Sequence, residues 1–309
     1  MRHRRLAAIA AVVAVVGATT AATLPPAPID RAQPLPALTA QALAARYSAN
    51  SIRIARTASA AKREGDANLL RALAGLRGQH YVDFNPNGQG LAVEVVGDLA
   101  TATRVAILVP GSDTSLATFD SRGTASPDGA ATALAAQVRK LDPGARLAVI
   151  AWLGYRTPST FSPGVLTSGD ARQGALALRS FVGQLTRDGR QVALLCHSYG
   201  SVVCGLAAPH LPVTDIAVFG SPGMDVSSVR ALDSRARVWA GRGSGDWIGD
   251  VPHIRILGLG FGRDPIAPSF GARIFDCGDA NHSEYFSPGG IALRNLAYIA
   301  LGRPAGVTR

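Results

Sequence analysis

The feature that most constrains the fold is a change of hydrophobic period at residue 80. From there on, short apolar runs rich in Val and Ile alternate with longer segments of helical period. The expected strands are Tyr81–Phe84, Leu91–Val96, Val105–Val109, Leu147–Trp152, Val192–Cys196, Ile216–Phe219, Val238–Ala240 and Ala272–Phe275. The expected helices between and after them are Gly129–Lys140, Ala171–Arg187, Tyr199–Ala208, Val226–Leu232 and Ile291–Leu301. This alternation predicts an α/β fold with a mostly parallel eight-stranded sheet and helices on both faces. Short turns between the first three runs predict antiparallel N-terminal strands.

The chain begins with a segment typical of protein export. A basic start, MRHRR, precedes the apolar run Leu6–Val16, and small residues follow it up to residue 23. The segment is either a cleaved signal peptide or an uncleaved N-terminal anchor. We therefore expect a secreted or cell-envelope-associated protein.

Composition shifts divide the rest of the chain. The expected parts are a signal at 1–23, a proline-rich linker at 24–38, a helical segment at 39–79, the main domain at 80–302 and a tail at 303–309. Thr39 and Asp66 are placed to cap two helices in the helical segment. The sequence does not indicate whether these helices pack on the main domain, whether they cover its site, or how the chain oligomerises.

The charge balance argues against a nucleic-acid partner. Lys and Arg number 31 against 21 Asp and Glu, a net charge of +10, but the basic residues are spread along the chain. A nucleic-acid surface would need a clustered basic stripe with aromatic residues beside it. Diffuse positive charge instead favours peripheral association with an anionic cell-envelope surface.

One strand-to-helix junction carries a serine in a chemically distinctive place. A buried strand, Gln191–Cys196, is followed by His-Ser-Tyr-Gly and then by the helix Ser201–Ala208. Strand, tight turn, serine and helix are the layout of a nucleophile elbow, in which the hydroxyl projects above the sheet. The helix N-terminus then directs its free N–H groups at the reacting oxygen. The alternative is an ordinary junction in which Ser198 merely caps the helix.

A serine nucleophile needs a base at its hydroxyl. In this fold type the order along the chain is Ser, then Asp or Glu, then His. His282 lies in the loop after the last expected strand, Ala272–Phe275, and is the favoured base. His210 follows the elbow helix on an expected surface, and His253 has no strand ending just before it.

The base in turn needs an acid that orients it. Asp246 lies in the glycine-rich loop after the strand Val238–Ala240, at the carboxyl edge of the sheet where this acid belongs. Asp250 and Asp264 remain alternatives.

An oxyanion hole needs two backbone N–H groups. The first is expected from Tyr199, directly after the serine. The strand Val105–Val109 leads into a Pro-Gly turn, so the second donor is expected at Ser112 or Asp113.

Three aromatic residues follow the fourth strand. Trp152, Tyr155 and Phe161 either line an acyl or aromatic pocket or belong to the core.

Three cysteines are too few for a disulfide scaffold. Cys196 and Cys277 are expected three strands apart, roughly 14 Å, which is too far for a disulfide. Cys204 lies roughly 9 Å along the elbow helix. We therefore expect three free, mostly buried thiols.

Cys277, Asp279 and His282 lack the spacing of a tetrahedral metal site, so we expect neither metal nor cofactor.

Four short motifs together resemble a largely uncharacterised α/β-hydrolase family. They are V-P-G at Val109–Gly111, C-H-S-Y-G-S at Cys196–Ser201, G-S-P-G-M at Gly220–Met224 and H-x-x-Y at His282–Tyr285. The family's elbow reads G-H-S-Y-G-S, so Cys196 departs from it. The resemblance covers about residues 80–301 and implies a Ser–Asp–His site and an esterase- or lipase-like class, without naming a substrate.

Together these observations predict a secreted serine hydrolase that cleaves a small-molecule or lipid ester through an acyl-enzyme on Ser198. Two alternatives stay open. The same residues could transfer the acyl group to an alcohol, or the fold could serve as a non-catalytic binding protein of the cell envelope.

Overall fold

The computed structural model describes most of the chain after the N-terminal segment. The described residues are 35–76, 80–121, 123–251, 253 and 259–309. The expected export signal and the expected linker up to residue 34 lie outside them. Within the described residues, no helix combines the length and the apolar character needed to cross a bilayer.

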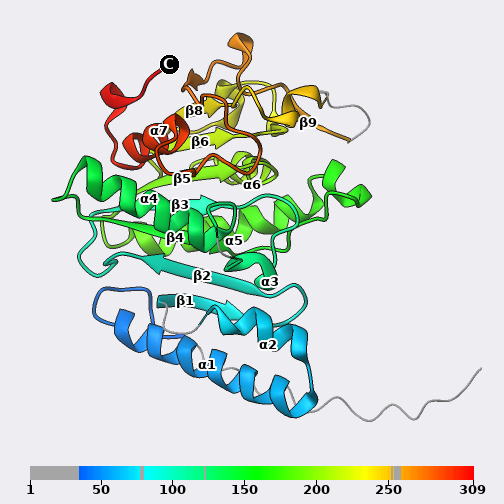
Figure 1. The fold of residues 1–309 in the computed structure, drawn as a ribbon. Coiled ribbons are helices and arrows are strands. Elements are labelled where there is room, and N and C mark those ends of the chain that lie inside the picture. The colour runs from blue at the N-terminus through cyan, green and yellow to red at the C-terminus, as the bar shows by residue number, and fades with distance from the viewer. Residues whose placement is uncertain (1–34, 77–79, 122, 252, 254–258) are drawn as a thin grey trace, which may run out of the picture. The chain divides into compact units, whose positions relative to one another are not determined.

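A mixed sheet forms the centre of the described part of the chain (Figure 1). Its strands are β1 (His80–Asn85), β2 (Leu91–Val96), β3 (Arg104–Val109), β4 (Leu147–Leu153), β5 (Gln191–His197), β6 (Asp215–Phe219), β8 (Arg237–Gly241) and β10 (Arg273–Ile274). The order is β1-β2-β4-β3-β5-β6-β8-β10. The β1–β2 and β2–β4 pairs are antiparallel and the other pairs are parallel. The predicted eight-stranded, mostly parallel sheet is confirmed.

The third strand departs from the expected antiparallel start. β3 does not pair with β2, because β4 lies between them, and β3 is parallel to both β4 and β5. Its continuous apolar run explains this position, since a strand buried on both faces belongs in the centre of a parallel sheet.

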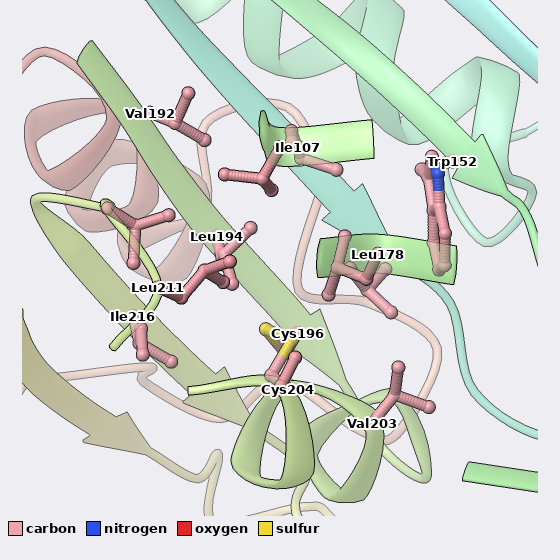
Figure 2. Close-up of a cluster of buried hydrophobic side chains, with 14 of the residues drawn as sticks. Ile107, Trp152, Leu178, Val192, Leu194, Cys196, Val203, Cys204, Leu211 and Ile216 are labelled. Atoms are coloured by element: carbon pink, nitrogen blue, oxygen red, sulfur yellow. A yellow bond between two sulfur atoms is a disulfide. The ribbon is translucent and has the colours of Figure 1, made fainter. Parts of the chain in front are cut away.

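Helices cover both faces of the sheet (Figure 1). The longer ones after β3 are α4 (Pro127–Leu141), α5 (Gly169–Thr186), α6 (Gly200–Ala207) and α7 (Ile291–Ala300), with a short α3 (Leu116–Phe119). Side chains of α5 and α6 share one apolar cluster with Ile107 and Leu194, part of which Figure 2 shows. Side chains of α4 and α7 share the other cluster with Leu108 and Leu195. Consecutive strand residues therefore point to opposite layers, as the period of a strand requires.

Of the two N-terminal helices, α1 (Leu43–Glu64) packs on the edge strand β1, and α2 (Ala67–Ala74) packs on α1 and α3. The Asp66 carboxylate caps α2 by accepting from the Leu69 amide at 2.9 Å. From α1, the Arg46 guanidinium donates to the Val82 carbonyl at 2.6 Å and the Asn50 amide donates to the Tyr81 carbonyl at 2.9 Å. These buried hydrogen bonds fix α1 at the edge of the sheet.

The expected helix at Val226–Leu232 is wrong. The segment contains the end of a short strand, β7 (Gly223–Val226), and a single 3-10 turn at Val229–Leu232. β7 pairs in parallel with β9 (Phe261–Gly262) in a second, two-stranded sheet. Asp233 has a left-handed φ of 47°, which ends the turn before a helix can continue.

The expectation of three free thiols is also wrong. Cys196 at the end of β5 and Cys204 in α6 form a disulfide, with Cα atoms 6.5 Å apart (Figure 2). The distance along the helix exceeds the distance between the two cysteines, because α6 turns back beside β5 directly after the elbow. Cys277 is the free, buried cysteine of the described residues.

Candidate active site

Ser198 stands on a strained turn between β5 and α6. Its φ is 52°, a left-handed value that side-chain-bearing residues rarely adopt. Its amide donates to the Phe219 carbonyl at 3.0 Å, which holds the turn against β6. Gly200 is required next to it, since a Cβ there would lie 2.4 Å from the Val109 carbonyl oxygen. The close approach of α6 to β3 lifts the Ser198 hydroxyl above the carboxyl edge of the sheet.

Two distant loops bring a histidine and an aspartate to this serine. His282 follows β10, and its Nε2 lies 3.0 Å from Ser198 Oγ. Its Nδ1 lies 2.8 Å from Asp246 Oδ1. Asp246 follows β8 and caps the 3-10 turn Trp247–Asp250. The three side chains therefore form one continuous hydrogen-bonded line from hydroxyl to carboxylate.

Asp246 stays ionised although it is almost fully buried. Burial alone raises the pKa of Asp246, but hydrogen bonds from His282, from the Tyr285 hydroxyl at 2.6 Å and from the Ile248 amide at 2.9 Å outweigh it and hold the pKa below its usual value. A charged carboxylate in this place fixes the imidazole with its proton on Nδ1, which leaves Nε2 free to accept the serine proton.

A second histidine supports the loop that carries His282. His197 Nε2 lies 2.8 Å from the His282 carbonyl oxygen. Burial, assisted by repulsion from His282, lowers the pKa of His197 to about 3. The ring is therefore neutral at ordinary pH and acts as an N–H donor to that carbonyl. Its face packs near Phe219, with ring centroids 5.5 Å apart.

The loop after β3 contains both residues expected to supply the second oxyanion donor, Ser112 and Asp113. The Asp113 amide donates to the Pro158 carbonyl at 3.0 Å, so the alternative of Asp113 as an oxyanion donor is wrong. The amides of Ser112 and Tyr199 have no acceptor among the described residues, and both residues line the cavity beside Ser198. The loop is held from behind by Tyr155, whose hydroxyl donates to the Pro110 carbonyl at 2.7 Å. The pair Ser112 and Tyr199 can hold a negative oxygen.

A cavity of about 460 Å³ opens next to the serine. Its size is within the range of small-molecule sites, and its walls are mostly apolar. Leu108, Leu195 and Phe286 form part of its wall, and no residue of α1 or α2 is among those lining it. The N-terminal helices therefore do not cover this cavity.

Comparison with known proteins decides the family. A model described as alpha/beta hydrolase matches residues 85–256, more than half of the chain. The chain belongs to the alpha/beta hydrolase family. The fold expected from the sequence, an α/β-hydrolase fold with antiparallel N-terminal strands, is thereby confirmed.

Relatives in this family occur in mycobacteria. The uncharacterized protein Rv2079 of Mycobacterium tuberculosis is 32% identical over 251 residues, covering 70% of this chain and 37% of that protein. The uncharacterized protein Mb0988c of Mycobacterium bovis is 32% identical over 151 residues, covering 46% of this chain and 56% of that protein. The chain thus spans between about a third and a little over half of the length of these relatives.

Solved structures with a similar fold include two esterases. Esterase PE8 is 15% identical with a TM-score of 0.42, covering 62% of this chain and 91% of its own. Esterase LipW from Mycobacterium marinum is 14% identical with a TM-score of 0.42, covering 88% of this chain and 92% of its own.

The three aromatic residues that the sequence suggested for the pocket do not line the cavity. Trp152 and Tyr155 are buried in the core beside α5, with ring centroids 6.0 Å apart. Phe161 is 98% exposed. The sequence could place Trp152 at the end of a strand, but it could not show on which face of the sheet the cavity lies.

The alternative acids and bases lie elsewhere. Asp264 pairs with Arg242 at 2.8 Å, and Asp250 is exposed. His253 Nε2 lies 3.1 Å from the Ser221 carbonyl oxygen, and the His210 side chain is 84% exposed. None of these contacts involves Ser198.

Two residues that support the site have no role that the sequence alone predicts. His197 and Tyr285 both lie inside the short motifs that resemble the family, one before the serine and one three residues after His282. Their presence in the motifs was the only signal, because their roles depend on contacts between distant loops. No group of three or more metal-binding side chains occurs among the residues that the structure describes.

Proposed function

We propose that this chain is a serine hydrolase that cleaves carboxylic esters through an acyl-enzyme on Ser198. The single observation that carries the proposal is the unbroken line from Ser198 Oγ through His282 to Asp246, at the wall of a largely apolar cavity. These distances are within the reach required of a nucleophile, its base and its orienting acid.

In the first half of the reaction, Ser198 Oγ attacks the ester carbonyl carbon while its proton passes to His282 Nε2. The carbonyl oxygen becomes an oxyanion, which the amides of Ser112 and Tyr199 hold; such a donor contributes about 3–4 kcal/mol. Asp246 stabilises the imidazolium that forms. His282 then gives its proton to the alcohol oxygen as the carbon–oxygen bond of the ester breaks.

In the second half, water takes the place of the alcohol. His282 Nε2 removes a proton from water as its oxygen attacks the acyl carbon, and the same two amides hold the new oxyanion. The bond to Ser198 Oγ breaks, the proton returns to Oγ, and a carboxylic acid leaves.

An alcohol in place of water would make the same site an acyltransferase, and adding acceptor alcohols during turnover would reveal the transfer product. The complete Ser–His–Asp line argues against a purely binding role.

The proposal extends to the surroundings of the enzyme. The export-type sequence at residues 1–23 supports secretion, and the spread of positive charge supports contact with the anionic cell envelope. Fractionating cells that produce the full chain tests this, and recovery of the protein from the cytosol alone would contradict it.

The test of activity compares Ser198, on the turn, with Ser201, three residues later in α6. p-Nitrophenyl esters from acetate to palmitate are offered to the wild type, to Ser198→Ala and to Ser201→Ala. The Ser201 hydroxyl is buried and donates to the Cys196 carbonyl at 3.2 Å, so it is a matched control with no base beside it. We expect Ser198→Ala to lower kcat/KM by about 10⁴-fold or more and Ser201→Ala to keep most of the activity. Equal losses in the two variants would contradict the proposal.

A further inference from the structure

The wall of the cavity beside Ser198 contains both buried and exposed side chains. The buried apolar ones from β3, β5, β6, α4 and the loop after His282 form what we call the acyl lobe. Its residues are Leu108, Pro127, Ala130, Leu195, Phe219 and Phe286. Each of them is buried, and Leu108 and Leu195 are direct cross-strand partners on the sheet face covered by α4 and α7. Leu166 and Trp247 also line the cavity but are 50% and 51% exposed.

The geometry of proton transfer separates the two halves of the substrate. His282 Nε2 must reach the leaving oxygen, so the alcohol leaves on the His282 side. The Trp247 ring lies next to His282 there, with centroids 4.7 Å apart, and is half exposed. Ser112 follows β3, which lies on one side of β5 in the sheet. Asp246 follows β8, which lies on the other side of β5, beyond β6. The acyl chain is therefore left the rest of the cavity, where buried side chains of β3, β5, β6 and α4 line the wall.

The acyl lobe has the chemistry of a hydrocarbon site. Its six side chains are apolar, so none of them offers a charge or a hydrogen bond to a polar chain. His197, which also lines the cavity, is held neutral by burial and by repulsion from His282. A charged or sugar-like group placed against these six side chains would lose water without gaining a hydrogen-bond partner from them.

We propose that the substrate is an ester of an unbranched, apolar carboxylic acid whose chain lies in the acyl lobe, and that Ala130 determines the longest chain that fits. The proposal rests on the proposed function and names its substrate class. Ala130 presents the smallest side chain of the acyl lobe, on the second turn of α4, where a larger side chain would fill space that the hydrocarbon occupies. Each methylene that enters the acyl lobe raises kcat/KM by up to about four-fold.

The experiment measures kcat/KM for acetate, butyrate, octanoate and dodecanoate esters with the wild type, with Ala130→Leu and with Ala136→Leu. Ala136 lies on the same helix but is exposed, so it is the matched control. We expect wild-type kcat/KM to rise with chain length. Ala130→Leu should lower kcat/KM for dodecanoate at least about ten-fold while changing acetate less than two-fold, and Ala136→Leu should change neither.

A second readout keeps this inference separate from the proposed function. The rate of covalent labelling by fluorophosphonates with ethyl and dodecyl chains is measured for the same proteins, with Ala130→Val as a smaller replacement if Ala130→Leu does not fold. A wild type without labelling and without ester hydrolysis overturns the proposed function. A labelled, active enzyme whose chain-length preference is flat, or is the same in both variants, overturns the acyl lobe alone.

Discussion

Two buried carboxyl groups in this molecule have opposite charge states. Asp246 is 7% exposed and Glu94, on β2, is 1% exposed. Three hydrogen-bond donors surround Asp246 and keep its pKa low, whereas Glu94 Oε2 has no partner among the described residues. Burial, with the nearby charges of Asp128 and Asp120, raises the pKa of Glu94 to about 9. Burial beside other carboxyl groups therefore protonates Glu94, whereas donors placed by distant loops keep Asp246 charged next to His282.

Two buried tyrosines repeat the contrast. The Tyr285 hydroxyl donates to Asp246 Oδ2 and accepts from the Gly243 amide at 3.2 Å. The Tyr81 hydroxyl lies near Glu94 and has no hydrogen-bond partner among the described residues. One cluster is a complete polar network and the other contains unpaired polar atoms.

The largest expected effect comes from replacing each carboxyl group with an isosteric amide. Asp246→Asn should lower kcat/KM by about 10⁴-fold, because a neutral amide no longer holds the proton of His282 on Nδ1. Glu94→Gln should leave kcat/KM within about two-fold, because Glu94 is already neutral at pH 7 and lies outside the cavity. Steady-state kinetics with p-nitrophenyl butyrate check both, and similar losses in the two variants would remove the contrast.

The next effect is a pH dependence of stability. Between pH 4.5 and about 9, Glu94 is protonated in the folded protein and ionised in the unfolded chain. The folded state thus binds the extra proton, and this group makes stability fall as pH rises, by up to about 1.4 kcal/mol per pH unit. Asp246 acts in the opposite direction, since its lowered pKa gives stability that is lost as pH falls below its ordinary value of 3.8.

Urea unfolding at pH 6, 7 and 8 tests this linkage. Glu94→Gln should be less sensitive to pH than the wild type, with the largest gain in stability at pH 8. Parallel pH dependences of the two proteins would show that Glu94 is ionised in the folded state.

The smallest effect compares the tyrosines. Tyr285→Phe removes a donor to a charged group, so the pKa of Asp246 should rise and kcat/KM, measured by steady-state kinetics, should fall about ten-fold. Tyr81→Phe removes a hydroxyl without a partner, so both activity and the midpoint of urea unfolding should stay the same or rise slightly. A loss of activity in Tyr81→Phe would mean that its hydroxyl has a partner, such as a buried water.

The sequence could predict those parts of the site that follow from position along a strand. Ser198, Asp246 and His282 each come soon after a strand of the parallel sheet, and carboxyl ends of parallel strands lie at one edge, so their meeting was predictable. The choice of Ser112 over Asp113 was not predictable, because it depends on the Pro158 carbonyl in another loop.

Two other features were beyond prediction for the same physical reason. The Cys196–Cys204 disulfide depends on how sharply α6 turns back against β5, which the helix length does not reveal. The location of the cavity depends on how α4 packs, because Pro127 and Ala130 in the first residues of this helix line it. The alternation along β4 shows which residues share a sheet face with Trp152, but it does not show which face borders the cavity.

The most direct test of the central claim is the intact mass of the protein after reaction with a fluorophosphonate, followed by peptide mapping. We expect one phosphonyl adduct per chain, located on Ser198, absent from Ser198→Ala and formed at least a hundred-fold more slowly in Asp246→Asn. An adduct on any other serine, or labelling of Ser198→Ala at the wild-type rate, would contradict this claim.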